Sequence, residues 1–427
     1  MSKNYFWFRR DLRFYDNLGL SVASNIDLPL VCLFIFDENI ISQLPKDDRR
    51  ISFIYNHLKS IDEKLREKGS SLRVERGNPD DVFRKIFDEE NVSAVFLNED
   101  YEPNAIARDA EIQKICDSNH VKFESFKDQV VFGKEDVLKN DGTPYTVFTP
   151  FKKRWLAKFD MNQHAINYNI GEHFDREDYE FPSLENIGFT LQDISMYDQV
   201  NWESIDQYDE NRNFPAVNGT TYLGVHLRFG TVSSRQLIRK FFNVNQTFVS
   251  ELIWREFFMQ ILYHFPKVID NSFKKKYDVI AWRNDEEEFL KWCKGETGYG
   301  IVDAGMRQLN ETGWMHNRVR MVVASFLCKH LLIDWRWGEA YFAEKLMDYD
   351  LSANNGNWQW AAGTGCDAAP YFRVFNPYEQ VKKFDRQLEY IKKWVPEYDS
   401  LDYQPIVDHK FARERALTTY KEGLAKA

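Results

Sequence analysis

The change in hydrophobic periodicity along the chain constrains its fold more than any other feature. Over about the first 130 residues, short apolar runs alternate with longer amphipathic stretches, which predicts a parallel α/β sheet. Ligands of such sheets bind beyond the carboxyl ends of the strands, but this part has no Gly-x-Gly-x-x-Gly or Walker motif. The expected strands are residues 5–8, 28–36, 72–74 and 95–97, with helices at 49–68, 79–89 and 104–116.

The alternating pattern is lost in residues 128–190, where turn signals such as Asp141-Gly142 and Phe181-Pro182-Ser183 predominate. From about residue 190 the periodicity is helical, and strand signals nearly vanish. The expected helical stretches include residues 250–264, 305–332 and 339–346. We therefore expect a Rossmann-like α/β domain, a long surface linker and a large all-helical domain, over residues 1–127, 128–190 and 191–427.

Composition narrows the class of protein. Of the 427 residues, 43% are hydrophobic and 29% charged, which is a globular profile. The net charge of −10 gives no overall attraction to DNA or membranes, so a polyanionic partner would need a local basic patch. The odd count of five cysteines, with no Cys-x-x-Cys, predicts neither a disulfide framework nor a metal site and fits a reducing cytoplasm. No signal peptide or apolar stretch of membrane-spanning length occurs in the sequence.

Tryptophan is concentrated in the second half, where nine of the twelve lie at or after position 254. Most of these can be helical core, but stacking on flat ligands or electron hopping between indoles would also use them. Residues 251–340 carry equal numbers of basic and acidic residues, so the negative excess lies elsewhere. Two groups of basic residues in this window either bind phosphates or are simply solvated surface: Lys274–Lys276, and Arg307, Arg318 and Arg320.

Helical spacing groups several of the polar and aromatic side chains. Glu251, Trp254 and Arg255 lie at i, i+3 and i+4, so they share a face. An acid, a flat ring and a cation on one face would suit an extruded base pair, although an exposed salt bridge is the simpler alternative. Asn317 and Met321 are likewise four apart and share a face.

The same arithmetic separates two tryptophans near residue 360. Trp358 and Trp360 are two apart and point to different sides of a helix, whereas Asn354 and Trp358 share one side. An asparagine amide can donate or accept, so it can contact a ligand atom in more than one protonation state.

Five blocks of sequence, running in order from residue 6 to 377, resemble the photolyase/cryptochrome family. The most specific is Thr312-Gly-Trp-Met-His-Asn-Arg-Val-Arg-Met321. The others are Phe6-Trp-Phe-Arg-Arg-Asp-Leu-Arg13, Glu251-Leu-Ile-Trp-Arg-Glu-Phe257, Asp348-Tyr-Asp-Leu-Ser-Ala-Asn-Asn-Gly-Asn-Trp-Gln-Trp360 and Ala368-Ala-Pro-Tyr-Phe-Arg-Val-Phe-Asn-Pro377. Within the family, the chain is most similar to bacterial class I photolyases of cyclobutane pyrimidine dimers.

The resemblance implies an α/β domain, a linker and a helical domain that holds FAD, active as reduced FADH−. It implies an enzyme, a carbon–carbon lyase, that uses light to pass an electron to a pyrimidine dimer in ultraviolet-damaged DNA. The partner is then damaged DNA, without a membrane, and the protein is expected to be a cytoplasmic monomer. The Asn317/Met321 pair and Asn354 favour cyclobutane-dimer repair over the two alternatives, a cryptochrome photoreceptor and a (6-4) photolyase.

The resemblance also assigns site residues by matching motif positions. Glu251, Asn317 and Met321 are the expected catalytic residues beside the dimer. The expected contacts to substrate and DNA are Arg212, Glu251, Trp254, Arg255, Asn317, Arg318 and Trp360. The expected cofactor contacts are Tyr208, Thr220, Thr221, Tyr222, Leu223, Gly224, Arg320, Asp348, Tyr349, Asp350 and Asn354. The expected electron-transfer chain is Trp358, Trp335 and Trp282, with Trp282 at its exposed end, and no metal is expected.

Two segments depart from the family pattern. In the phosphate-binding block, Tyr222 and Gly224 replace an Arg and a Ser, so backbone N–H groups would carry more of the phosphate contact there. Folate-binding members place an Asn-Glu pair where this chain has Asn104-Ala105. The sequence therefore does not identify the antenna chromophore. A folate, a deazaflavin and the absence of any antenna are the alternatives.

Overall fold

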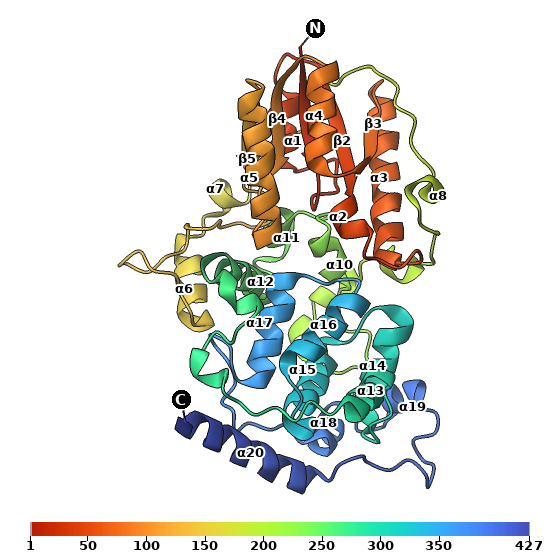
Figure 1. Ribbon diagram of the computed structural model, residues 1–427, viewed down its shortest axis with the longest axis vertical. Helices are drawn as coiled ribbons and strands as arrows, with labels where there is room; N and C mark the ends of the chain where they lie inside the picture. Colours follow the sequence, from red (N-terminus) through yellow and green to blue (C-terminus); the bar gives the residue numbers. More distant parts are fainter. Residues whose placement is uncertain (1, 427) are drawn as a thin grey trace. The chain divides into compact units, whose positions relative to one another are not determined.

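The apolar runs of the first 130 residues form a five-stranded parallel sheet (Figure 1). The strand order is β3-β2-β1-β4-β5, so the order reverses beside β1, where the crossover from β3 to β4 passes to the other side. The computed structural model describes residues 2–426. The strands are β1 (Lys3–Phe8), β2 (Leu30–Asp37), β3 (Leu72–Gly77), β4 (Val92–Asn98) and β5 (Lys122–Phe126).

Both faces of the sheet are covered, which explains why its central strands are continuous apolar runs. Trp7 of β1 packs in one core cluster with Phe83 of α4 and Ile112 of α5, and Figure 1 shows these two helices over the same face. On the other face α1 lies close, because a Cβ on Gly19 would come within 2.9 Å of the Phe6 ring. The helices of this part are α1 (Leu18–Ser24), α2 (Glu38–Ile41), α3 (Arg49–Glu67), α4 (Pro79–Glu89) and α5 (Pro103–Ser118).

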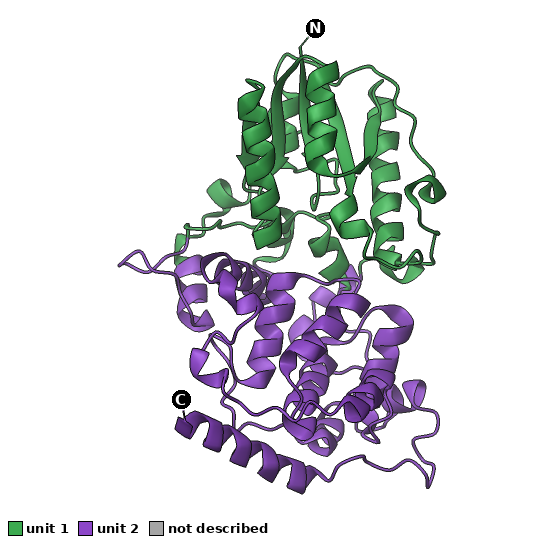
Figure 2. Cartoon of the chain, in the orientation of Figure 1, with its two compact units in different colours: residues 1–136, 157–200, 222–242 green, residues 137–156, 201–221, 243–427 purple. Residues whose placement is uncertain are grey.

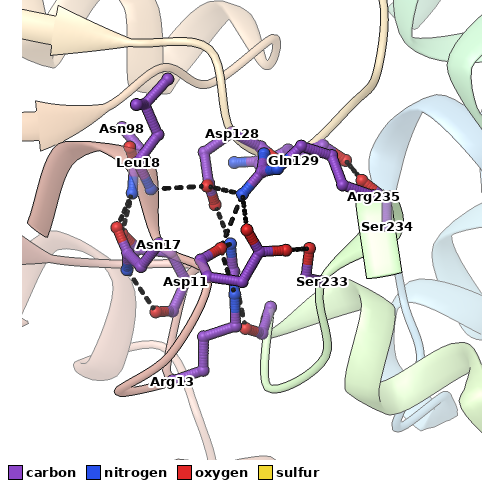
Figure 3. Close-up of polar contacts among 12 residues, drawn as sticks. Asp11, Arg13, Asn17, Leu18, Asn98, Asp128, Gln129, Ser233, Ser234 and Arg235 are labelled. Carbon is purple, nitrogen blue, oxygen red and sulfur yellow. Dashed lines mark hydrogen bonds and ion pairs between the residues drawn. The ribbon is translucent and has the colours of Figure 1, made fainter. Parts of the chain in front are cut away.

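A buried polar network ties the loop after β1 to segments far along the chain (Figure 3). The Asp128 carboxylate accepts from Arg13 Nη2 at 2.5 Å and from Arg235 Nη2 at 2.8 Å. Arg235 also donates to the Asp16 carbonyl at 2.6 Å, and Ser233 donates to the Asp16 carboxylate. Charge-assisted hydrogen bonds in a dry environment are the strong ones. The network therefore fastens α11 (Ser234–Phe241) to the loops at the carboxyl ends of the strands.

The rest of the chain is helical, as expected, but the expected linker and one expected helix differ in detail. Residues 128–190 contain helices α6 (Phe148–Lys158), α7 (Met161–His164) and α8 (Leu184–Ile187). The helical stretch expected over 305–332 is broken at Gly313, which ends α14 in a left-handed conformation (φ 73°). A new helix then begins at Asn317 and continues as a wider, π-helical turn over Phe326–Leu331.

Residues of several of the remaining helices, all in unit 2, form a Trp-rich core that includes Trp292, Trp335 and Trp358. Within residues 2–426, no helix is long and apolar enough to cross a membrane, and no group of three or more His, Cys, Asp or Glu could hold a metal ion. The remaining α-helices of the chain are α9 (Tyr208–Asn211), α10 (Leu223–Arg228), α11, α12 (Gln246–His264), α13 (Glu286–Lys294), α14 (Gly300–Thr312), α15 (Asn317–Ser325), α16 (Trp335–Lys345), α17 (Leu351–Ala362), α18 (Pro377–Phe384), α19 (Glu389–Trp394) and α20 (His409–Lys426).

The chain divides into two compact units, each built from separate stretches of sequence (Figure 2). Unit 1 holds the sheet and comprises residues 1–136, 157–200 and 222–242. Unit 2 is helical and comprises residues 137–156, 201–221 and 243–427. The three-part division proposed from the sequence remains a prediction.

Candidate functional site

Helix α12 presents three of the expected site residues on its partly exposed face. Glu251, Trp254 and Arg255 are partly exposed, whereas the intervening Leu252 and Ile253 are buried. The helix begins where the Asn245 side chain accepts the N–H groups of residues 247 and 248. This side-chain cap sets the start of the helix and so the face on which the later residues lie.

The structure pairs Glu251 with another expected site residue, Arg212. Arg212 Nη1 lies 2.5 Å from Glu251 Oε1, and its guanidinium lies 5.1 Å from the centre of the Tyr208 ring. Burial lowers the pKa of Arg212, but the Glu251 carboxylate more than offsets this and raises it. Burial, together with Glu251, raises the pKa of Tyr208 to about 12, so the phenol is neutral. Arg212 therefore holds the Glu251 carboxylate in a fixed place within unit 2.

The N-terminus of α15 is capped by a neutral histidine. His316 Nδ1 accepts the N–H of Arg318 at 3.1 Å, which places its proton on Nε2. Burial, then the positive charges of Arg320, Arg318 and Arg212, lowers the pKa of His316 to about 3. The imidazole is thus an uncharged cap in an electropositive setting.

Four buried polar atoms around this cap have no hydrogen-bond partner in the described chain. They belong to the three residues Arg212, His316 and Arg318 and to the adjoining Asn317, and are Arg212 Nε, His316 Nε2, Arg318 Nε and Asn317 Oδ1. Unsatisfied buried groups cost free energy and are uncommon. Their grouping beside the Arg212–Glu251 pair indicates a place prepared for a polar ligand.

Arg318 is held in place by contacts that leave its charge available. Its Nη2 donates to Asn213 Oδ1 at 2.5 Å, and its guanidinium lies 4.4 Å from the centre of the Phe384 ring. Its Nη1 also reaches Met321 Sδ at 3.9 Å, so Met321 lies beside it. Neither Asn213 nor Phe384 is a carboxylate, so the cation keeps its capacity to bind an anion.

Trp254 has an aromatic neighbour that the sequence did not reveal. The Phe148 ring of α6 stacks on it in parallel, with the centroids 3.6 Å apart and the planes at 9°. The Phe148 N–H donates to Asp367 Oδ2 at 2.9 Å, which fixes the start of α6. Trp360, the other expected stacking residue, is partly exposed and lies 6.4 Å from Phe375. The Phe258 ring also stacks on Trp254, at 5.3 Å and 29°, so the indole is held among aromatic rings.

Asn354 is oriented by a residue that the sequence analysis did not single out. Its Nδ2 donates to the Glu339 carbonyl at 3.0 Å and to Glu339 Oε1 at 3.1 Å. A backbone carbonyl can only accept, so the amide orientation is fixed and Oδ1 is left to accept from a ligand. Burial raises the pKa of the Glu339 carboxyl.

Other expected cofactor contacts have local roles in unit 2. Arg320 and Asp348 form the expected pair as two parallel hydrogen bonds of 3.1 and 2.9 Å. Asp350 caps α17 by accepting the N–H of Ala353 at 3.2 Å. Tyr349 is partly buried against the Trp-rich core.

The expected phosphate-binding block spans the point where the chain passes from unit 2 to unit 1. Thr220 and Thr221 are buried and belong to unit 2, while Tyr222, Leu223 and Gly224 belong to unit 1. Tyr222 adopts a left-handed conformation, with φ 58°. Such a backbone is uncommon for a residue with a Cβ, so the turn into α10 is strained.

The three expected electron-transfer tryptophans differ in exposure. Trp358 and Trp335 are almost fully buried, and Trp282 is partly exposed and contacts Tyr420 at 5.8 Å. A Cβ on Gly338 would lie 2.1 Å from the Trp358 ring. Trp358 therefore rests directly on the backbone of α16, the helix that also carries Trp335.

Comparisons with known proteins agree with this arrangement. A family model described as "DNA photolyase" matches residues 4–168, and one described as "FAD binding domain of DNA photolyase" matches residues 248–414. A deoxyribodipyrimidine photo-lyase from Escherichia coli is 36% identical over 99% of this chain and 99% of its own. The chain belongs to the DNA photolyase family.

Other relatives of this photolyase-family chain cover nearly its whole length. A deoxyribodipyrimidine photo-lyase from Synechococcus sp. is 36% identical over 92% of this chain and 87% of its own. Among solved structures, a class III photolyase from Agrobacterium tumefaciens has a TM-score of 0.88 at 31% identity, covering 100% of this chain and 98% of that one. A photolyase from Sulfolobus tokodaii with two FAD molecules has a TM-score of 0.86 at 36% identity, covering 98% and 100%.

The comparisons confirm the family, the fold class and the FAD-binding domain that the sequence predicted. The donor set of unit 2 fits a flavin on chemical grounds. Asn354 offers an oriented acceptor for a ring N–H, the Arg320–Asp348 pair offers both donors and acceptors, and Thr220 and Thr221 offer hydroxyls. The roles of the individual residues remain predictions.

Proposed function

We propose that this chain repairs cyclobutane pyrimidine dimers in DNA with light. The observation that carries the proposal is the group of unsatisfied buried polar atoms around the α15 cap, next to the Arg212–Glu251 pair. A pyrimidine dimer presents carbonyl oxygens and imide N–H groups, which are the partners that these atoms lack. The relatives named deoxyribodipyrimidine photo-lyase support the same reaction.

The residues of the chain bind and orient the substrate in this proposal. Extruding a base costs a few kcal/mol and least for damaged bases, so selection of the dimer begins with its poor stacking. Trp254 and Trp360 stack on the extruded pair, and each base stack contributes about 1–3 kcal/mol. Arg318, and the part of the Arg212 guanidinium not bound to Glu251, attract the flanking phosphates.

Glu251, Asn317 and Met321 lie beside the reacting rings. Glu251, held in place by Arg212, accepts from an imide N–H, and Asn317 Oδ1 accepts from the second one. FAD, when bound in its reduced form and excited by light, supplies one electron. The dimer then splits its two cyclobutane carbon–carbon bonds and returns the electron, so the reaction has no net change in charge or oxidation state. Asn354, Arg320 and Asp348 hold the flavin, with Tyr208, Thr220, Thr221, Tyr222, Leu223, Gly224, Tyr349 and Asp350.

The cellular setting is a part of the same proposal. All five cysteines are free, and four of them are buried, which supports a reducing compartment such as the cytoplasm. The proposed partner is ultraviolet-damaged DNA, bound by a monomer. The identity of a second, antenna chromophore is not assigned. Because the Sulfolobus tokodaii photolyase carries two FAD molecules, a second flavin is a candidate beside folate and deazaflavin.

A substitution of Glu251 tests the proposed substrate contact. We expect Glu251→Ala to lower the affinity for dimer-containing DNA about tenfold, because a hydrogen bond to a charged group contributes about 1.5–3 kcal/mol. The flavin should stay bound. Affinity is measured by fluorescence anisotropy with a labelled oligonucleotide in the dark.

The matched control is Glu287→Ala, which removes an exposed carboxylate of α13 that pairs with Lys291. It should leave the affinity unchanged. Loss of flavin in Glu251→Ala, or unchanged affinity for the dimer, would contradict the role given to Glu251.

A further inference from the structure

A buried lysine of unit 2, Lys329, is bound by groups other than carboxylates. It lies in the π-helical turn over residues 326–331 and is 1% exposed. Its Nζ donates to the Ala362 carbonyl at 2.7 Å and lies 3.7 Å from the centre of the Tyr420 ring. Lysine is rarely fully buried unless it is paired with an acid, and π-helical turns are frequent at functional sites. Lys329 is therefore a candidate for a specific role.

The carbonyl that Lys329 contacts ends the helix that carries several of the expected site residues. α17 ends at Ala362, and Gly363 follows it in a left-handed conformation, with φ 90°. The last carbonyls of a helix have no partner within the helix, and Ala362 is fully buried, so its carbonyl needs donors from elsewhere. Lys329 Nζ and the Tyr420 hydroxyl, at 2.8 Å, are these donors. The two side chains therefore fix the place where α17 ends.

Fixing this end of α17 also fixes the residue proposed to stack on the substrate. Trp360 is two positions before Ala362, and its carbonyl accepts the Gly363 N–H at 3.3 Å. A Cβ on Gly363 would lie 3.5 Å from Lys329 Nζ, so the amine lies against the turn as well as against the carbonyl. Small displacements of a group that meets the substrate are costly. The hold on Ala362 therefore bears directly on the position of the Trp360 ring.

We propose that Lys329 is a positioning residue for dimer binding, which acts by holding the Ala362 carbonyl and, through it, Trp360. This inference rests on the proposed function, because that function gives Trp360 a substrate to stack on. The role requires an N–H donor in a dry place, and the amine donates with or without its charge. A side chain that lacks the donor would leave the Ala362 carbonyl with the Tyr420 hydroxyl alone.

The surroundings of Lys329 favour the neutral amine. Burial lowers its pKa to about 7. The titratable groups around it are Cys328 of the same turn, Tyr420 of α20 and, beyond Tyr420, Tyr277 and Asp334. Burial raises the pKa of Cys328 and of Tyr420, so both are neutral and neither supplies an anion.

This pKa sets the direction of a pH effect on the junction of α17, α20 and the π-helical turn. If the junction opens, Lys329 meets water and its pKa returns to the usual value of 10.5. Between about pH 7 and pH 10.5 the open junction then binds a proton that the closed one does not. The closed junction therefore becomes less stable relative to the open one as the pH falls through this window, and it changes little below pH 7.

Two substitutions of Lys329 separate its donor from its bulk. Lys329→Met removes the N–H donor, and Lys329→Gln keeps one without a charge. The flavin-loaded variants are titrated in the dark with labelled dimer-containing and undamaged oligonucleotides. We expect Lys329→Met to lower the ratio of the two affinities about fivefold, and Lys329→Gln to lower it about twofold or less. Retained flavin and an unchanged affinity for undamaged DNA show that a variant is folded.

The matched control is Lys421→Met, which removes an exposed lysine of α20 and should leave the ratio unchanged. Hydrogen exchange measures the hold on α17 without DNA. From pH 9 to pH 7, the protection factors of the amides in α20 and at the end of α17 should fall about tenfold in wild type. They should change about twofold or less in Lys329→Gln, which has no amine to protonate.

Wild type with both oligonucleotides distinguishes a failure of this inference from a failure of the proposed function. If wild type does not prefer the dimer, the proposed function is wrong and the role of Lys329 falls with it. If wild type prefers the dimer but Lys329→Met keeps that preference, or Lys329→Gln loses as much of it, Lys329 does not position Trp360. An equal pH dependence of exchange in wild type and Lys329→Gln would show that Lys329 does not hold the junction.

Discussion

At the scale of single residues, the site depends on side chains held in one charge state. His316 is the clearest case, because its unsatisfied Nε2 and its capping Nδ1 both belong to the neutral ring. The folded-state pKa of about 3 lies below the unfolded value of about 6.5. The unfolded chain therefore binds a proton at this residue between these pH values and the folded chain does not, so stability falls as the pH drops through that window.

The lowered pKa of His316 predicts how the stability of the protein depends on pH. Between pH 7 and pH 5, His316 alone should remove about 2 kcal/mol from the free energy of unfolding. His316→Asn keeps a side chain suited to an N-cap and should flatten this part of the pH dependence. Urea unfolding at pH 7 and pH 5 measures the difference. His120→Asn, at an exposed turn, is the control, and an equal slope in both variants would refute the assignment.

Trp254 gives a second prediction at this scale. Trp254→Ala should weaken binding of dimer-containing DNA by about 1–3 kcal/mol, because it removes one base-stacking surface. Phe148→Leu should cost less, about 0.5–1.5 kcal/mol, since it removes only the parallel ring that orients the indole. Titration of the labelled oligonucleotide in the dark gives both values. A larger loss for Phe148→Leu than for Trp254→Ala would mean that Phe148, and not Trp254, contacts the base.

At the scale of elements, the sequence predicted the buried strands and amphipathic helices because burial imposes their periodicity. It missed β5, an edge strand that pairs only with β4 and whose residues 122–126 are partly exposed, so no apolar run marks it. It also missed α6, whose apolar face of Phe148, Phe151 and Trp155 follows directly on turn signals. Periodicity alone could not show that Gly313 ends one helix before His316 caps the next.

Helical spacing predicted which candidate residues share a face, and the Arg320–Asp348 pair was expected, but most other contacts of the candidate site were not predicted. Same-face spacing placed Glu251 and Trp254 together, because a helix has a fixed geometry. It could not show that Arg212, 39 residues away, would bind Glu251, since that contact depends on how α9 and α12 pack. Glu339 and Phe148 were missed for the same reason, because neither belongs to a motif that contains its partner.

The polar network of unit 1 predicts the cost of removing the carboxylate that fastens α11. Asp128→Asn leaves the buried cations of Arg13 and Arg235 without their shared anion, which should cost about 3–5 kcal/mol of stability. Guanidinium chloride unfolding of the flavin-loaded protein, followed by far-ultraviolet circular dichroism, measures the loss.

The control for this variant is Glu287→Gln, which breaks an exposed pair with Lys291 and should cost under about 1 kcal/mol. If Asp128→Asn costs no more than the control, the network does not hold α11 in place.

At the scale of the whole molecule, the proposed function requires an acidic chain to bind a polyanionic substrate. The net charge of −10 opposes binding of DNA, so the local cations Arg212 and Arg318 must carry the attraction. The affinity for undamaged DNA should therefore be weak and fall steeply with salt, while damaged DNA keeps the additional contacts of the extruded dimer.

The most direct test of the central claim is a repair assay with the full chain. Flavin-loaded, chemically reduced protein is mixed with oligothymidine that carries cyclobutane dimers, and the thymine absorbance is followed under near-ultraviolet or blue light. We predict that the absorbance returns in the light and stays constant in the dark. No return in the light, with flavin bound and reduced, would contradict the account and favour a photoreceptor or repair of (6-4) photoproducts.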